Sequence, residues 1–98
     1  MANYRKLERV VKGFSNHRRI QMLQLVSDNP DLSLYEISGK LKINFKTASE
    51  HLRRLTVSGL ISKRSEGSFV HHKISQRGKT ILRFLKKLEY KIDEKELN

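Results

Sequence analysis

The sequence predicts a mainly α-helical fold with one small β-hairpin, which places it in the α+β class. Apolar residues recur at helical spacing in about five segments, and one strand–turn–strand pattern follows the fourth of them. The chain has 98 residues and a single proline, which leaves room for long helices. This length suits one domain over residues 1–98 with a small core, so a second subunit would add stability.

Two helices are expected at the start of the chain. The first covers residues 2–13, with Asn3 as its cap and Gly13 at its end. Ser15 is the candidate cap of the second helix, which is expected to stop just before the turn-forming residues 28–31.

The next segment carries a specific signal for a helix start. Ser33 and Glu36 fit the S-x-x-E capping box, in which each side chain pairs with the backbone amide of the other residue. Leu32 and Ile37 lie where they can form a hydrophobic staple across this cap. The segment therefore predicts a short helix of about two turns.

A longer helix is expected after the tight connection at Lys42 and Ile43, with Asn44 as its cap and Gly59 as its stop. One narrow face of this helix is apolar and carries Ala48, Leu52 and Leu55. The opposite face is polar and carries Lys46, Glu50, Arg53 and Arg54, with Ser49 at its margin. A short helix, a tight turn and a longer helix with a polar outer face predict a helix-turn-helix over residues 33–58.

Residues 60–75 are typical of a basic β-hairpin. Two strand-like segments, 60–65 and 69–75, are joined through a turn in which Gly67 can adopt a positive φ. A basic hairpin that follows a helix-turn-helix is a wing, so the elements together predict a winged helix-turn-helix.

Ser75 is expected to cap a last helix over residues 76–92, followed by a polar tail, residues 93–98, that we expect to fray. The apolar stripe of this helix is wider than the rest of the domain can cover. We therefore expect the first and last helices to form a homodimer interface through Tyr4, Leu7, Val11, Leu85, Leu88 and Ile92.

The positive charge is concentrated in one part of the chain. The formal net charge is +11, and residues 42–79 contain nine Lys or Arg residues against two acids. Such a concentration is expected where a polyanion binds, although a solvated basic face that only keeps the protein in solution would carry the same charge.

The sequence offers no chemistry for an enzyme or a metal site. It contains no cysteine, no phosphate-cradling glycine loop and no nucleophile–base pattern, so we expect no catalysis and no cofactor. His71 and His72 are adjacent on a strand and point to opposite faces, while His17 and His51 lie on different helices. No apolar run approaches the roughly 20 residues of a membrane span, and no signal peptide is apparent, so we expect a cytoplasmic protein.

Residues 14–74 resemble the ArsR (arsenical-repressor-like) family. Residues 14–23 resemble its opening helix, with Arg19 at the usual arginine; residues 46–61 resemble its recognition helix and exit, and residues 66–74 its wing. Residues 75–78 are closer to MarR-like proteins. The resemblance implies a homodimer formed by the first and last helices and binding to palindromic operator DNA.

Two departures from the ArsR pattern concern metals. Members that sense metals through thiolates carry cysteines on the short helix, where this chain has residues 34–37, and members that bind zinc between the last helices use histidines that this last helix lacks. The family's metal-sensing function is therefore not carried over to this chain.

The recognition helix is expected to lie in the major groove of DNA. Lys46 and Arg53 can donate to guanine, Glu50 can accept from cytosine, and Ser49 can pair with several bases. The remaining candidates are suited to phosphate contacts or lie at the margin of this face. They are Asn44, Thr47, Arg54, Lys63, Arg64 and Lys73.

These features predict a sequence-specific, double-stranded-DNA-binding transcriptional regulator, a repressor, acting as a homodimer on a palindromic operator. A non-specific or RNA-binding basic winged-helix protein, or a module for protein contacts, would share the fold and charge. Glu50 favours the regulator, because an acid repels phosphate but can read cytosine. The sequence points to no particular small-molecule effector.

Overall fold

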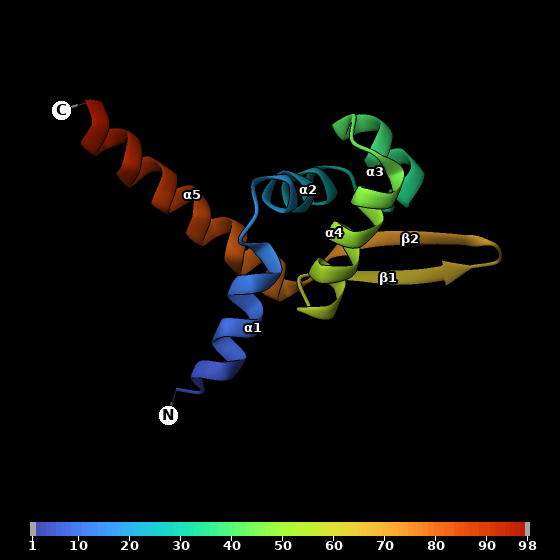
Figure 1. The fold of residues 1–98 in the computed structure, drawn as a ribbon, viewed down its shortest axis with the longest axis horizontal. Coiled ribbons are helices and arrows are strands. Elements are labelled where there is room, and N and C mark those ends of the chain that lie inside the picture. The colour runs from blue at the N-terminus through green and yellow to red at the C-terminus, as the bar shows by residue number, and fades with distance from the viewer. Residues whose placement is uncertain (1, 98) are drawn as a thin grey trace.

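The computed structural model describes the backbone of residues 2–97 and the side chains of residues 2–94. The elements, in chain order, are α1 (Tyr4–Phe14), α2 (His17–Asp28), α3 (Leu34–Leu41), α4 (Phe45–Val57), β1 (Ile61–Glu66), β2 (Phe69–Ile74) and α5 (Gln76–Leu97). Figure 1 shows α1 and α5 extending from one side of the molecule and the hairpin from the other. Within the described residues, five helices and one two-stranded hairpin confirm the predicted fold class.

The first two helices begin at asparagine caps. The Asn3 side chain accepts from the Lys6 amide at 3.1 Å, as predicted for α1. The cap of α2 is Asn16, so the prediction of Ser15 is wrong. Ser15 is the C-cap of α1, and the extended backbone that a cap requires appears one residue later, where Asn16 accepts from the next helical amides.

The connection between α3 and α4 takes the predicted form. Ser33 and Glu36 exchange both bonds of the capping box at 3.1 Å. Lys42 adopts the left-handed conformation, with φ of 54°, which turns the chain sharply after α3. The Asn44 side chain then accepts from the Lys46 and Thr47 amides and starts α4. Lys42 and Asn44 therefore set the turn between α3 and α4.

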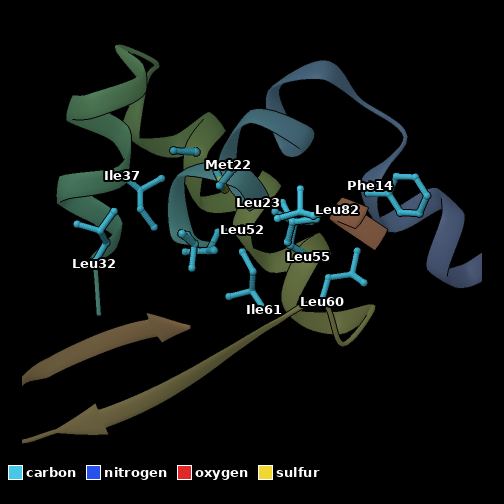
Figure 2. Close-up of a cluster of buried hydrophobic side chains, with 12 residues drawn as sticks. Phe14, Met22, Leu23, Leu32, Ile37, Leu52, Leu55, Leu60, Ile61 and Leu82 are labelled. Carbon is cyan, nitrogen blue, oxygen red and sulfur yellow. The ribbon is translucent and has the colours of Figure 1, made fainter. Parts of the chain in front are cut away.

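The core lies where α2, α3, α4 and the base of the hairpin meet (Figure 2). Helix α4 contributes Ala48, Leu52 and Leu55, which are at most 5% exposed. The other buried hydrophobic residues are Phe14, Met22, Leu23, Val26, Leu32, Ile37, Leu60, Ile61 and Leu82. The predicted apolar face of α4 is therefore the face that holds this helix in the domain.

The base of the hairpin is fixed to the segment that precedes α3. Strands β1 and β2 pair antiparallel from Ile61 opposite Ile74 to Glu66 opposite Phe69, and the turn contains Gly67 with φ of 61°. Beyond this ladder, the His72 amide donates to the Leu32 carbonyl and the Asp31 amide donates to the His72 carbonyl, both at 3.0 Å. The wing is thus anchored at its base and free at its tip.

Helix α5 is longer than predicted. The Ser75 hydroxyl accepts from the Gly78 amide at 3.0 Å and caps the helix as expected, but the helix continues to Leu97 and not to residue 92. The polar tail expected after residue 92 is helical as far as residue 97, because this segment contains no glycine or proline to stop a helix, and its fraying stays a prediction. Residues 1 and 98 of the predicted domain lie outside the described residues.

Helix α5 approaches the hairpin base so closely that only glycine fits at position 78. A Cβ atom there would overlap the Leu60 carbonyl oxygen, which is backbone and cannot rotate away. We expect Gly78→Ala to lower the free energy of unfolding by about 1–3 kcal/mol. The matched control is Gly39→Ala in α3, where no atom lies within 4 Å and the helix should gain about 0.5–1 kcal/mol. Urea unfolding measures both, and equal stabilities of the two variants would contradict the close approach.

Candidate nucleic-acid interface

The outer face of α4 is polar from Lys46 to Arg54 and ends at the exposed Val57. It lies opposite the buried residues of the helix and is exposed along its length. The side chains that sequence reasoning selected here, Lys46, Thr47, Ser49, Glu50, Arg53 and Arg54, are all exposed. The arrangement offers cationic donors, hydroxyl groups and one carboxylate to a ligand that approaches this face.

Glu50 holds the two arginines of this face. Its carboxylate accepts from Arg53 at 2.7 and 3.0 Å and from Arg54 at 3.2 Å, with all three side chains about half exposed. The hydrogen bond from Arg53 is the largest cause that lowers the pKa of Glu50 to about 2. Glu50 therefore stays ionised at neutral pH and orients both guanidinium groups before any ligand arrives.

Phe45 lies exposed at the start of α4, beside the outer face, and is not among the residues predicted from the sequence. It is the first residue of α4 after the Asn44 cap, and 53% of its surface is exposed. An aromatic side chain at the exposed start of a recognition helix can contact the methyl group of thymine. Its position directly after the Asn44 cap, in the first turn of the helix, was the signal that could have identified it.

The three cationic residues chosen on the hairpin lie on different faces. Lys63 is opposite His72 in the ladder and shares the face toward α4, where it lines a hollow of about 420 Å³ with Ser49 and Arg53. Arg64 and Lys73 face away from α4. They lie 3.4 and 3.8 Å from carboxylates of Glu66 and Asp31, respectively. Only Lys63 is therefore placed beside the outer face of α4.

Arg19 connects three helices behind the polar face. Its guanidinium lies 3.1 Å from Nδ1 of His51 in α4 and donates to the Lys12 carbonyl of α1 at 3.3 Å. Burial, followed by the charge of Arg19, lowers the pKa of His51, so the ring is neutral and Nδ1 accepts from the arginine. The sequence identified Arg19 only through the family resemblance, and nothing in the spacing predicted its partner.

His72 is a structural residue of the wing. Only 3% of its surface is exposed, and its Nδ1 lies 2.8 Å from the Leu32 carbonyl. Burial lowers its pKa, so the neutral ring donates this bond at neutral pH.

Within the described residues, no three His, Asp or Glu side chains are grouped so that they could share a metal ion. No described helix is long and apolar enough to cross a membrane.

The residues predicted for a dimer interface lie on α1 and α5. Tyr4, Leu7 and Val11 are 79%, 54% and 50% exposed, and Leu88 and Ile92 are nearly half exposed. The sixth residue, Leu85, is half-buried against the core.

A groove of about 810 Å³ runs between α2 and α5. It is lined by the apolar residues Ile20, Leu25, Leu85, Leu88 and Ile92 and by the acids Asp28, Glu89 and Asp93.

Comparisons with known proteins place this fold among regulators. A family model described as "Bacterial regulatory protein, arsR family" matches residues 16–63. HlyU of Vibrio cholerae, named a transcriptional activator, is 35% identical over 66 residues, which are 67% of this chain and 60% of HlyU. The structure of its reduced form has a TM-score of 0.74 at 32% identity and covers 88% of this chain and 90% of that chain.

Two further relatives extend the comparison. A homodimeric winged helix-turn-helix DNA-binding domain from Mycobacterium bovis, described as a possible ArsR-family regulator, has a TM-score of 0.76 at 28% identity over 93% of this chain and 82% of that chain. An HTH-type transcriptional regulator of Methanocaldococcus jannaschii is 28% identical over 89 residues, which are 90% of this chain and 100% of that protein. These likenesses confirm the predicted winged helix-turn-helix fold.

The half-buried His51 and the buried His72 predict a pH dependence of stability. Both pKa values are lowered in the folded state, so the unfolded chain binds protons first as the pH falls below the ordinary histidine value of 6.5. The contribution of these two neutral histidines to stability is therefore fully present above that pH and is lost as the pH falls below it. Urea unfolding should show that the free energy of unfolding falls between pH 7.5 and pH 5.5, and that it falls less in the His51→Gln/His72→Gln variant. An equal loss in wild type and variant would contradict this assignment.

Proposed function

This chain belongs to the arsR family of bacterial regulatory proteins, DNA-binding transcriptional regulators that are not enzymes, and we propose that it recognises specific double-stranded DNA as a homodimer. The observation that carries the proposal is the outer face of α4, which presents donors, hydroxyl groups and one carboxylate on a helix held rigidly from behind. Such a mixture suits base edges, whereas a uniformly basic face would suit phosphates alone.

Helix α4 has the dimensions for the major groove. An α-helix with its side chains is about 10–12 Å across, and the major groove is about 12 Å wide. Lys46 and Arg53 donate to guanine O6 and N7, and Ser49 bonds to a base or phosphate beside them. Phe45 contacts a thymine methyl group at the start of the helix. Glu50 either accepts from cytosine N4 or keeps both arginines oriented toward guanine.

The remaining predicted residues position the helix on the DNA backbone. Asn44 and Thr47 lie at the N-terminus of α4, where backbone amides and the helix dipole favour a phosphate. Lys63 meets the backbone beside α4, while Arg64 and Lys73 contact it from the far side of the wing after leaving their exposed carboxylate partners. Arg54 completes this set at the C-terminal part of α4.

The homodimer places two recognition helices on one duplex. The exposed apolar residues of α1 and α5 lie at the side of the molecule opposite to the wing (Figure 1). Pairing through that side leaves both copies of α4 and of the wing free, and two-fold symmetry then requires a palindromic site. The related domain from Mycobacterium bovis is described as homodimeric, which supports the same assembly here.

Repression is the regulatory mode that we propose. A dimer bound at its operator excludes other proteins from the same DNA, and repression needs nothing beyond that occupancy. The related HlyU is by name a transcriptional activator, so activation is the alternative mode for this chain.

Substitutions on α4 and on the wing should affect binding differently. Lys46→Ala and Arg53→Ala remove base contacts, so each should cost about 1–3 kcal/mol per half-site and relax the preference at one base position. Lys63→Ala removes a phosphate contact and should weaken specific and random DNA equally, with a salt slope shallower by about one unit per contact. Glu50→Ala should strengthen binding to random DNA, because it removes a carboxylate that repels phosphate.

These variants are compared by fluorescence anisotropy on a duplex enriched from a random pool, a random duplex of equal length and a double-stranded RNA, at two salt concentrations. Lys87→Ala on α5 is the matched control, because Lys87 is exposed and lies outside the proposed interface. The proposal is refuted if all α4 substitutions shift specific and random affinities in parallel. Equal affinity for the RNA would instead identify a general nucleic-acid binder.

The dimer is tested separately from DNA. Wild type should sediment as a dimer at tens of micromolar. Leu7→Glu and Leu88→Glu place a charge on the apolar faces of α1 and α5 and should each give monomers that remain helical. Tyr35→Glu is the matched control, because Tyr35 is 78% exposed on α3, away from both faces. A monomeric wild type would disprove the proposed assembly.

A further inference from the structure

A second cationic hollow lies on the other side of α4 from the wing. It has a volume of about 190 Å³ and is formed between α1 and α4, and we call it the α1-side hollow. Arg9 and Lys12 line it from α1, and Arg53 and Arg54 line it from α4. Two carboxylates contact these groups: Glu8 lies 3.8 Å from Lys12, and Glu50 pairs with both arginines. Four cationic groups therefore meet two exposed acids.

The close packing of α1 on α4 brings these charges together. Gly13, near the end of α1, lies so near Ser58 that a Cβ atom at position 13 would overlap the serine side chain. Arg19 donates to the Lys12 carbonyl of α1 and also contacts His51 of α4, so it joins the two helices. The basic side chains of α1 are therefore held beside the recognition helix by the fold and are not an unrelated run of surface charge.

Helix α1 keeps this basic edge apart from its dimer face. At about 100° per residue, Arg9 lies about 160° around the helix from Leu7, and Lys12 lies about 100° from Val11. The apolar residues of α1 can therefore be covered by a second copy while the basic edge stays open. One helix has two separate surfaces for two partners.

Duplex DNA has phosphates on both sides of its major groove, and these are the candidate ligands of the α1-side hollow. A helix in the major groove lies between the two sugar–phosphate strands that border the groove, one on each side. One flank of α4 carries the hollow of about 420 Å³ that Lys63 and Arg53 line beside the wing, and the opposite flank carries the α1-side hollow. We propose that the α1-side hollow binds phosphates of the second bordering strand, with Arg9 and Lys12 as the contacts from α1. This inference rests on the proposed function.

The test removes the two charges of α1 without touching the apolar stripe. Arg9→Gln/Lys12→Gln should weaken binding to the enriched and the random 30-bp duplex by the same factor. The salt slope should become shallower by about one unit per lost contact, which is about four units per dimer. Lys87→Gln/Lys91→Gln removes the same charge from exposed positions on α5 and should leave the slope unchanged. Sedimentation of both variants confirms that the dimer is retained.

Neutral methylphosphonate linkages in the enriched duplex locate the contact. Substitution on the strand that borders the α1-side hollow should weaken wild type but have little further effect on Arg9→Gln/Lys12→Gln. If this variant binds with wild-type affinity and slope while Lys63→Ala shows a shallower slope, the inference is wrong and the proposed function stands. If wild type itself does not prefer the enriched duplex and its slope is shallower than about −3, the proposed function fails, and this inference fails with it.

Discussion

The burial of one narrow face of α4 is the constraint on which the rest of the structure depends. Ala48, Leu52 and Leu55 fill the centre of a small core, so α4 can neither rotate nor slide without opening a cavity. The same burial directs the other side of the helix to solvent over its whole length. A surface that must match base edges needs a support of this kind, because a displacement of about 1 Å weakens a preorganised contact.

Polar contacts refine the position that the core sets. Arg19 holds α1 and α2 to His51 of α4, and His72 fastens the base of the wing to the segment before α3. On the outer face, Glu50 restrains Arg53 and Arg54, which lowers the cost of ordering two long side chains when DNA binds. The recognition surface is therefore largely arranged in the unbound chain, and its one carboxylate reduces attraction to DNA of any sequence.

Local signals in the sequence predicted most of the fold. The Ser33 capping box, the Asn44 cap and Gly67 act over a few residues, so the positions of α3, α4 and the hairpin turn follow from neighbouring residue types. The choice of Asn16 over Ser15 depended on where the backbone leaves α1, which spacing does not reveal. The pairing of Lys73 with Asp31 and of Arg19 with His51 joins distant parts of the chain, and such partners appear only when the elements pack. Phe45 was missed because helical spacing places it only about 20° from the buried Leu52, and its exposure at the start of α4 appears only in the packed structure.

The proposed function requires two copies of α4, related by two-fold symmetry, to read base edges in one duplex. Selection of bound sequences from a random double-stranded DNA pool tests it most directly, because the protein itself chooses its operator from the pool. We expect enrichment of two inverted half-sites whose centres lie about 10–10.5 bp apart, or a multiple of that spacing. A pool that stays random after repeated selection, or one that enriches a single unrepeated motif, would contradict it.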